Sequence, residues 1–144
     1  FKGNKIEAVH SFTVMPKDCN FNTNSENQKN DILFGGKLLF EIDYAGAKIA
    51  RRSTYDVDSD MIVTASIDRI NFEKPAYLGD IVTMVATIKS LGKSSISIRV
   101  KVNRESKVGE IEQICSATMT FVTIKDGKSI PHHLNLDKLS DTES

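Results

Sequence analysis

The chain has 144 residues, of which 40% are hydrophobic, as expected for one globular domain with a single core. Its 19 basic and 19 acidic side chains give no net charge, so no overall field favours binding to nucleic acid or to an anionic membrane. We find neither a run of about 18 apolar residues nor a secretory leader, and we expect a cytoplasmic protein. Cys19 and Cys115 lack metal-site or redox spacing, which predicts two free thiols.

The first predicted strand is the SFTVMP segment at residues 11–16, and a polar loop follows it over residues 17–30. A long helix is predicted next, from Gly35 to Arg51 or Arg52, with cations in its last turn where the helix dipole favours them. Its apolar residues recur at helical spacing and predict a buried stripe. The stripe consists of Leu38, Leu39, Ile42, Ala45, Ile49 and Ala50.

Asp43 is out of place in this helix. It lies beside the apolar stripe, and its neighbours one turn away in either direction are apolar or small, so they solvate a charge poorly. A carboxylate in such a position is expected either to have a partner that offsets the free-energy cost of its poor solvation or to serve a function. The sequence leaves two explanations open, a functional carboxylate or an ion pair with Lys37, Lys48 or Arg69.

Strand periodicity begins after the helix and predicts an antiparallel sheet packed on one central helix, which is an α+β layout. One domain is expected over residues 1–144, with a core at about residues 8–126 and a polar, loose tail at about residues 127–144. One helix covers too little of such a sheet to protect its edges, which predicts at least a homodimer. The four predicted strands are residues 61–72, 81–92, 93–105 and 114–126.

The strand at residues 61–72 shows simple alternation of apolar and polar side chains. Thr64, Ser66 and Asp68 are expected to share one face as ordinary solvated positions, opposite Val63, Ala65 and Ile67.

Gly35 and Gly36 open the predicted helix, where unpaired N–H groups carry partial positive charge and glycine allows close approach of a ligand oxygen. Such a site can stabilise an oxyanion, although glycines also serve where a chain simply turns sharply. With a helical pitch of 5.4 Å, Asp43 lies roughly 10 Å further along the axis than Gly36. One substrate can therefore contact both only if part of the site comes from elsewhere.

Basic side chains gather around the predicted hairpin at residues 91–93. They form either solvated surface or a site for the phosphates of an anionic cofactor. The three histidines have no cysteine or acidic partner at metal spacing, so we expect no metal site. The hairpin set comprises Lys93, Ser94, Arg99, Lys101 and Arg104, and the histidines are His10, His132 and His133.

Four segments together resemble the hotdog-fold acyl-CoA thioesterases of the bacterial acyl-CoA hydrolase type, over about residues 8–126. The resemblance implies a long helix wrapped by an antiparallel sheet, the layout already predicted. It also implies hydrolysis of acyl-CoA to a free acid and CoA, with no metal, no serine nucleophile and no cofactor beyond the CoA of the substrate. The segments are MPKDCNFN at 15–22, LFGGKLLFEIDYAGAKIA at 33–50, VTASIDRINFEKPAYLGD at 63–80 and GKSSISIRVKV at 92–102.

The resemblance further implies an active site shared between two subunits. Asp43 matches the helix carboxylate, a general base or nucleophile, and faces the partner's Gly-Gly loop, matched by Gly35 and Gly36. It implies a homodimer, and a hexamer built as a trimer of dimers. Many relatives carry Asn or Asp where this chain has Ile32, so Asp31 is the candidate for that role and Asn30 the alternative.

The hairpin GKSS matches the family region that contacts CoA, which makes Lys93, Ser94 and Ser95, together with the basic Arg99, candidates for the nucleotide end.

Two other functions compete with hydrolysis. A hotdog dehydratase or hydratase needs a histidine at the site, and none occurs between residues 11 and 131. A non-catalytic module that binds and senses acyl-CoA would not require Asp43.

Overall fold

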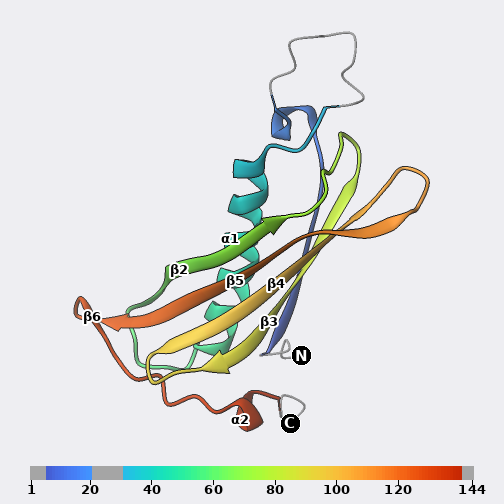
Figure 1. Ribbon diagram of the computed structural model, residues 1–144. Coiled ribbons are helices and arrows are strands. Elements are labelled where there is room, and N and C mark those ends of the chain that lie inside the picture. The colour runs from blue at the N-terminus through green and yellow to red at the C-terminus, as the bar shows by residue number, and fades with distance from the viewer. Residues whose placement is uncertain (1–5, 21–30, 141–144) are drawn as a thin grey trace.

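The computed structural model describes residues 6–20 and 31–140, in which one long helix lies in the hollow of an antiparallel sheet (Figure 1). The strands follow the order β1-β3-β4-β5-β2, and β6 pairs with the end of β5. The predicted α+β class is confirmed. The elements are β1 (Glu7–Thr13), the 3-10 turn η1 (Pro16–Asp18), α1 (Gly35–Ser53), β2 (Met61–Phe72), β3 (Ile81–Leu91), β4 (Ser95–Glu105), β5 (Ile111–Lys125), β6 (Lys128–Ser129) and α2 (Leu136–Ser140).

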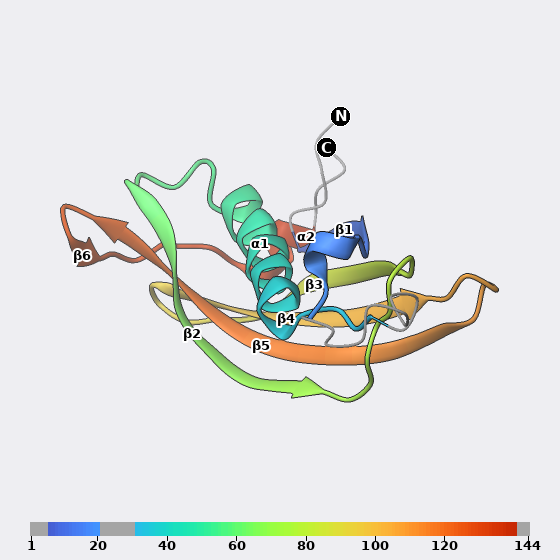
Figure 2. The same cartoon turned by 90° about the horizontal axis from the view of Figure 1, so that it is seen from above.

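The core lies between α1 and the concave face of the sheet, as the view from above shows (Figure 2). Five residues of the predicted stripe form the inner side of α1, where Ile42 and Ile49 are fully buried. Burying one such side chain contributes about 2 kcal/mol to folding. Leu39, the sixth, is half-buried and lies outside the core. The strand predicted at residues 93–105 is confirmed as β4, and its side chains alternate between buried and partly or fully exposed. Its inner residues Ile96, Ile98, Val100 and Val102 are all fully buried.

Gly46 lies close to the side chains of β5. A Cβ atom at this position would lie 2.8 Å from Sδ of Met119 and 3.1 Å from Cε1 of Phe121. We expect Gly46→Ala to lower the free energy of unfolding by about 1–2 kcal/mol, because overpacking outweighs the better helix propensity of alanine. Chemical denaturation measures this change. A variant as stable as the wild-type protein would show that the core yields to the added methyl group at no cost.

Strand β2 departs from the predicted simple alternation because it contains β-bulges. Thr64 and Ser66 lie opposite consecutive residues of β5, Phe121 and Thr120, so Ala65 is an extra residue in the ladder. Directly opposite residues of an antiparallel pair point to the same face of the sheet. Since Phe121 is buried in the core, Thr64 faces α1. The prediction that Thr64 shares a solvated face with Ser66 is therefore wrong.

The segment after β5 is better ordered than the predicted loose tail. It forms β6 and α2, and Leu139 is buried. His132 is also buried, and its main-chain N–H donates to the carbonyl of Lys93. Its ring Nε2 lies 2.9 Å from the carbonyl oxygen of Ser95, and Nδ1 accepts the N–H of Leu134 at 2.9 Å. A buried imidazole thus fastens this segment to the β3–β4 hairpin.

Two other boundaries differ from the prediction. The first strand is Glu7–Thr13 rather than residues 11–16, and Pro16 opens η1. The last long strand begins at Ile111 rather than at residue 114. Both cysteines are free thiols, as expected, and burial raises the pKa of Cys115 to about 11.

Candidate active site

Helix α1 begins at Gly35, and both Gly35 and Gly36 are exposed. Phe34 occupies the N-cap position without a side-chain hydrogen bond to the helix. The first N–H groups of a helix have no acceptor inside it. Neither glycine has a positive φ, so a sharp turn does not explain them. At Gly36, a Cβ would lie 2.7 Å from the Phe34 ring, and the two glycines leave the helix end open to a ligand.

Asp43 lies two turns further along α1, half-buried on the side that faces β2. Its Oδ1 accepts a hydrogen bond of 2.8 Å from the hydroxyl of Thr64. Within residues 6–20 and 31–140 it forms no ion pair. The predicted ion-pair explanation is wrong, since Lys37 pairs with Glu41 and Lys48 donates to the carbonyl of Val9.

The deeply buried carboxylate of α1 is Glu41, 7% exposed, rather than Asp43. Its carboxylate accepts hydrogen bonds from Lys37 Nζ at 2.8 Å and from His10 Nε2 at 2.5 Å. Burial raises the pKa of Glu41, but the bonds from Lys37 and His10 outweigh it, and the net direction is downward. The sequence offered one signal for this pair, the i,i+4 spacing of Lys37 and Glu41. Glu41 is thus held as a structural ion.

The loop before α1 places Asp31 near the helix N-terminus. Asp31 is half-buried, and its main-chain carbonyl accepts the N–H of Leu78 at 2.9 Å. The next residue, Ile32, forms an isolated antiparallel bridge with Tyr77. Asn30 lies outside the described residues. Seven residues separate Gly36 from Asp43, which corresponds to about 10 Å along the helix, so a single chain does not bring these two groups onto one carbonyl.

The candidate CoA-binding residues of the hairpin lie at the other end of α1. The β3–β4 hairpin, with Lys93 and Ser94, is at the C-terminal end of the helix, whereas the glycines are at the η1 end (Figure 1). Ser95 uses its carbonyl to hold His132. Arg99 alternates with the buried Ile98, so it projects from the sheet face opposite α1. Within one chain, the sheet therefore lies between Arg99 and Asp43.

Within the described ranges, no group of three or more His, Cys, Asp or Glu side chains is placed to hold a metal ion. In the same part of the chain, none of the helices combines the length and the hydropathy of a membrane-crossing segment.

A long helix that lies in the hollow of an antiparallel sheet is the layout of a hotdog fold. Comparison with known families gives the class, since the model of the thioesterase superfamily matches residues 30–110, more than half of the chain. The chain belongs to this superfamily. The sequence-based prediction of the family is confirmed.

Three relatives are named as acyl-CoA hydrolases or as a thioesterase. The chain is 34% identical over 131 residues to an uncharacterized acyl-CoA thioester hydrolase of Bacillus subtilis, YkhA, and this match covers 87% of the chain and 67% of the relative. An acyl-CoA hydrolase of Staphylococcus aureus, solved with coenzyme A, superposes with a TM-score of 0.71 and 26% identity, over 97% of this chain and 81% of that one. A hexameric thioesterase of Yersinia pestis gives a TM-score of 0.70 and 29% identity, over 85% of this chain and 91% of that one.

Proposed function

We propose that this protein hydrolyses acyl-CoA thioesters to a free acid and CoA, and that Asp43 is the catalytic carboxylate. As a general base, Asp43 takes a proton from water as the water oxygen attacks the thioester carbonyl carbon. As a nucleophile, it attacks that carbon itself, and water then cleaves the resulting anhydride. In both routes the CoA sulfur leaves as a thiolate and is protonated. The N–H groups of Gly35 and Gly36 stabilise the negative carbonyl oxygen.

The observation that carries this proposal is the pairing of Asp43 with Thr64. Among the described residues, no cation pairs with this half-buried carboxylate and one hydroxyl orients it, which leaves its second oxygen for a water molecule or a carbonyl carbon. Solved variants of the S. aureus acyl-CoA hydrolase replace an aspartate or a threonine by alanine. These two residue types are the ones that meet here.

We also propose that a second copy completes the site, because the glycines and Asp43 of one chain are too far apart. Strand β2 is an edge strand, most of its residues are exposed, and it carries the Thr64 that contacts Asp43. Pairing of two β2 strands across a two-fold axis would cover both edges and place each Asp43 close to the other chain. Hexameric assembly is found in the Y. pestis relative and supports a trimer of dimers.

Light scattering during size-exclusion chromatography tests this assembly. We expect a mass of at least twice the 16.0 kDa of one chain, and six times that mass for a trimer of dimers. A fully active species at the mass of one chain would contradict the shared site.

The remaining roles rest on the resemblance to the family. We propose that Asp31 orients water or substrate against the Asp43 of the second copy, and that Lys93, Ser94, Ser95 and Arg99 contact the nucleotide of CoA. No metal or separate cofactor takes part in the proposed reaction.

A thiol-release assay tests the activity itself. Purified protein is mixed with acyl-CoAs from acetyl to palmitoyl in the presence of a thiol reagent, and CoA release is followed over time. Turnover identifies a hydrolase and also defines the preferred chain length. Binding of acyl-CoA without thiol release would instead identify the sensing module, and no signal of either kind would refute the proposal.

Thr64 offers a smaller test of the same site. We expect Thr64→Val to lower kcat about tenfold. The substitution removes the hydrogen bond that orients the Asp43 carboxylate, and the loss of one hydrogen bond to a charged group costs about 1.5 kcal/mol. The matched control is Ser66→Val, because Ser66 points to the opposite face of the sheet. Equal effects of the two substitutions on kcat would assign Thr64 to folding rather than to catalysis.

A further inference from the structure

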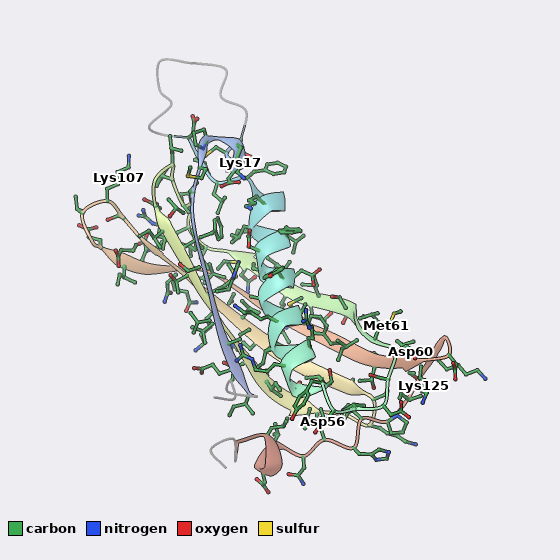
Figure 3. The ribbon with its side chains drawn as sticks, turned by 180° about the vertical axis from the view of Figure 1, so that it is seen from behind. Lys17, Asp56, Asp60, Met61, Lys107 and Lys125 are labelled. Carbon is green, nitrogen blue, oxygen red and sulfur yellow. The ribbon has the colours of Figure 1, made fainter. Side chains whose placement is uncertain are left out.

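The two edges of the sheet differ in how α1 meets them. Strand β1 forms one edge and β2 the other, and the two strands lie on opposite sides of α1, with Met61 marking the start of β2 (Figure 3). At β2, the helix makes a contact between side chains, from Asp43 to Thr64. At β1, side chains of the helix reach the main chain of the strand. The unpaired main chain of an edge strand is a template on which another chain can pair.

The register of β1 on β3 decides which backbone groups face the free edge. The N–H of Ile88 in β3 donates to the carbonyl of Ile6 at 2.8 Å, and the pairing continues through β1 without a bulge. In an antiparallel pair, residues that bond to the neighbouring strand alternate with residues whose N–H and C=O point away from it. The residues that present their backbone to the free edge are therefore Glu7, Val9 and Ser11.

Two cations of α1 hold carbonyls of this free edge. Arg52 Nη1 donates to the carbonyl of Glu7 at 3.0 Å, and Lys48 Nζ donates to the carbonyl of Val9 at 3.4 Å. The two donors are four residues apart, about 6 Å along the helix axis. The two acceptors are alternate residues of the strand, about 7 Å apart. Helix and strand therefore run in opposite directions with matched spacing, and each cation meets its own carbonyl.

The helix dipole explains the presence of cations at this end of α1 but not their direction. The dipole favours positive side chains in the last turn of a helix, and it acts alike on Arg51 and Arg52. Arg51 is exposed, whereas Arg52 is half-buried and bonded to β1. Fixing a long side chain on a strand carbonyl costs rotamer entropy that the dipole does not require. The bonds to β1 therefore need an explanation of their own.

We propose that Arg52 and Lys48 close the β1 edge against a second copy of this chain, so that copies pair through β2 alone. An incoming strand would place its own N–H nitrogens about 2.9 Å from the outward carbonyl oxygens. The side-chain nitrogens of α1 already lie there. On a two-fold axis, the cations of both copies would also face each other, which disfavours the pair.

Closure of β1 matters for the site because the two edges are not equivalent. Two copies joined at β1 would leave both β2 edges, with their contacts between Asp43 and Thr64, at the far ends of the combined sheet. Each Asp43 would then lie far from the other chain. This consequence rests on the proposed shared site, whereas the closure itself does not.

A double variant with Lys48→Met and Arg52→Met tests the closure. Methionine keeps the length and the helix propensity of these side chains but removes both donors and both charges. By light scattering during size-exclusion chromatography, we expect a mass at least twice that of the wild-type protein at the same concentration, because the β1 edge now accepts a second strand. The matched control combines Arg51→Met on the same helix with Lys128→Met on β6, and its mass should equal that of the wild-type protein. An unchanged mass of the first variant, or equal growth of both, would overturn the proposal.

A third substitution shows whether the growth occurs at β1. Ser11→Pro removes an N–H that points to the free edge and leaves the bonds to β3 intact, which proline tolerates on an edge strand. Added to the double variant, it should return the mass to the wild-type value. Hydrogen exchange followed by mass spectrometry should show slower exchange in β1 of the enlarged species. An enlarged species that persists with Ser11→Pro, or in which β1 gains no protection, would refute pairing at this edge.

None of these measurements requires enzymatic activity. A protein that releases no CoA would refute the proposed hydrolysis, and the masses of the variants would still decide whether the two cations close the β1 edge.

Discussion

Replacement of Asp43 by asparagine is expected to lower kcat by about two to four orders of magnitude while the protein stays folded, the range typical of a lost base or nucleophile. Asparagine keeps the shape of the side chain and can still accept the hydroxyl of Thr64. It cannot take a proton from water at neutral pH, nor attack a carbonyl carbon. Steady-state thiol release with the preferred acyl-CoA measures the loss, and circular dichroism checks the fold.

Two other acidic residues serve as controls for this variant. Asp56→Asn removes an exposed carboxylate just beyond the same helix, and kcat should stay within a factor of two of wild type, as for most surface changes. Glu41→Gln removes the buried carboxylate that pairs with Lys37, so stability should fall more than kcat. An Asp43→Asn enzyme that retains activity within about a factor of three would exclude Asp43 from the mechanism.

The helix and the core were predictable because both depend on local periodicity. The apolar stripe from Leu38 to Ala50 places α1 on the sheet, and the alternation of Ile96 to Val102 defines the inner face of β4. These patterns need no knowledge of partners distant in the sequence. The resemblance of four ordered segments to one family implies the same layout.

The site was less predictable because its geometry depends on register and on contacts between distant residues. A bulge at Ala65 rotates Thr64 toward α1, and a sequence shows such a bulge only when the pairing with β5 is known. His10 reaches Glu41 across 31 residues of sequence. Sequence periodicity therefore predicts Asp43 to be the poorly solvated carboxylate of the helix, whereas the structure buries Glu41 and leaves Asp43 half-exposed beside Thr64.

Mixing two inactive variants is expected to restore activity if each site combines the Asp31 of one chain with the Asp43 of the other. Asp31→Ala and Asp43→Asn chains are each expected to be nearly inactive alone. In a mixed dimer, one of the two sites then contains both wild-type residues. Reassociation of equal amounts should give up to about a quarter of full activity, since half of the dimers are mixed and half of their sites are intact.

A substitution beside Asp31 distinguishes an effect on catalysis from an effect on loop folding. Ile32→Ala should alter binding or stability rather than kcat, because Ile32 bridges to Tyr77 through its backbone. If mixed dimers form and no activity returns, Asp31 and Asp43 either act from the same chain or do not act together. An Asp31→Ala enzyme with normal kcat decides for the second case, because a group that orients the reacting water cannot be lost without a slower chemical step. Recovered activity, in contrast, requires that residues of two chains meet at one thioester.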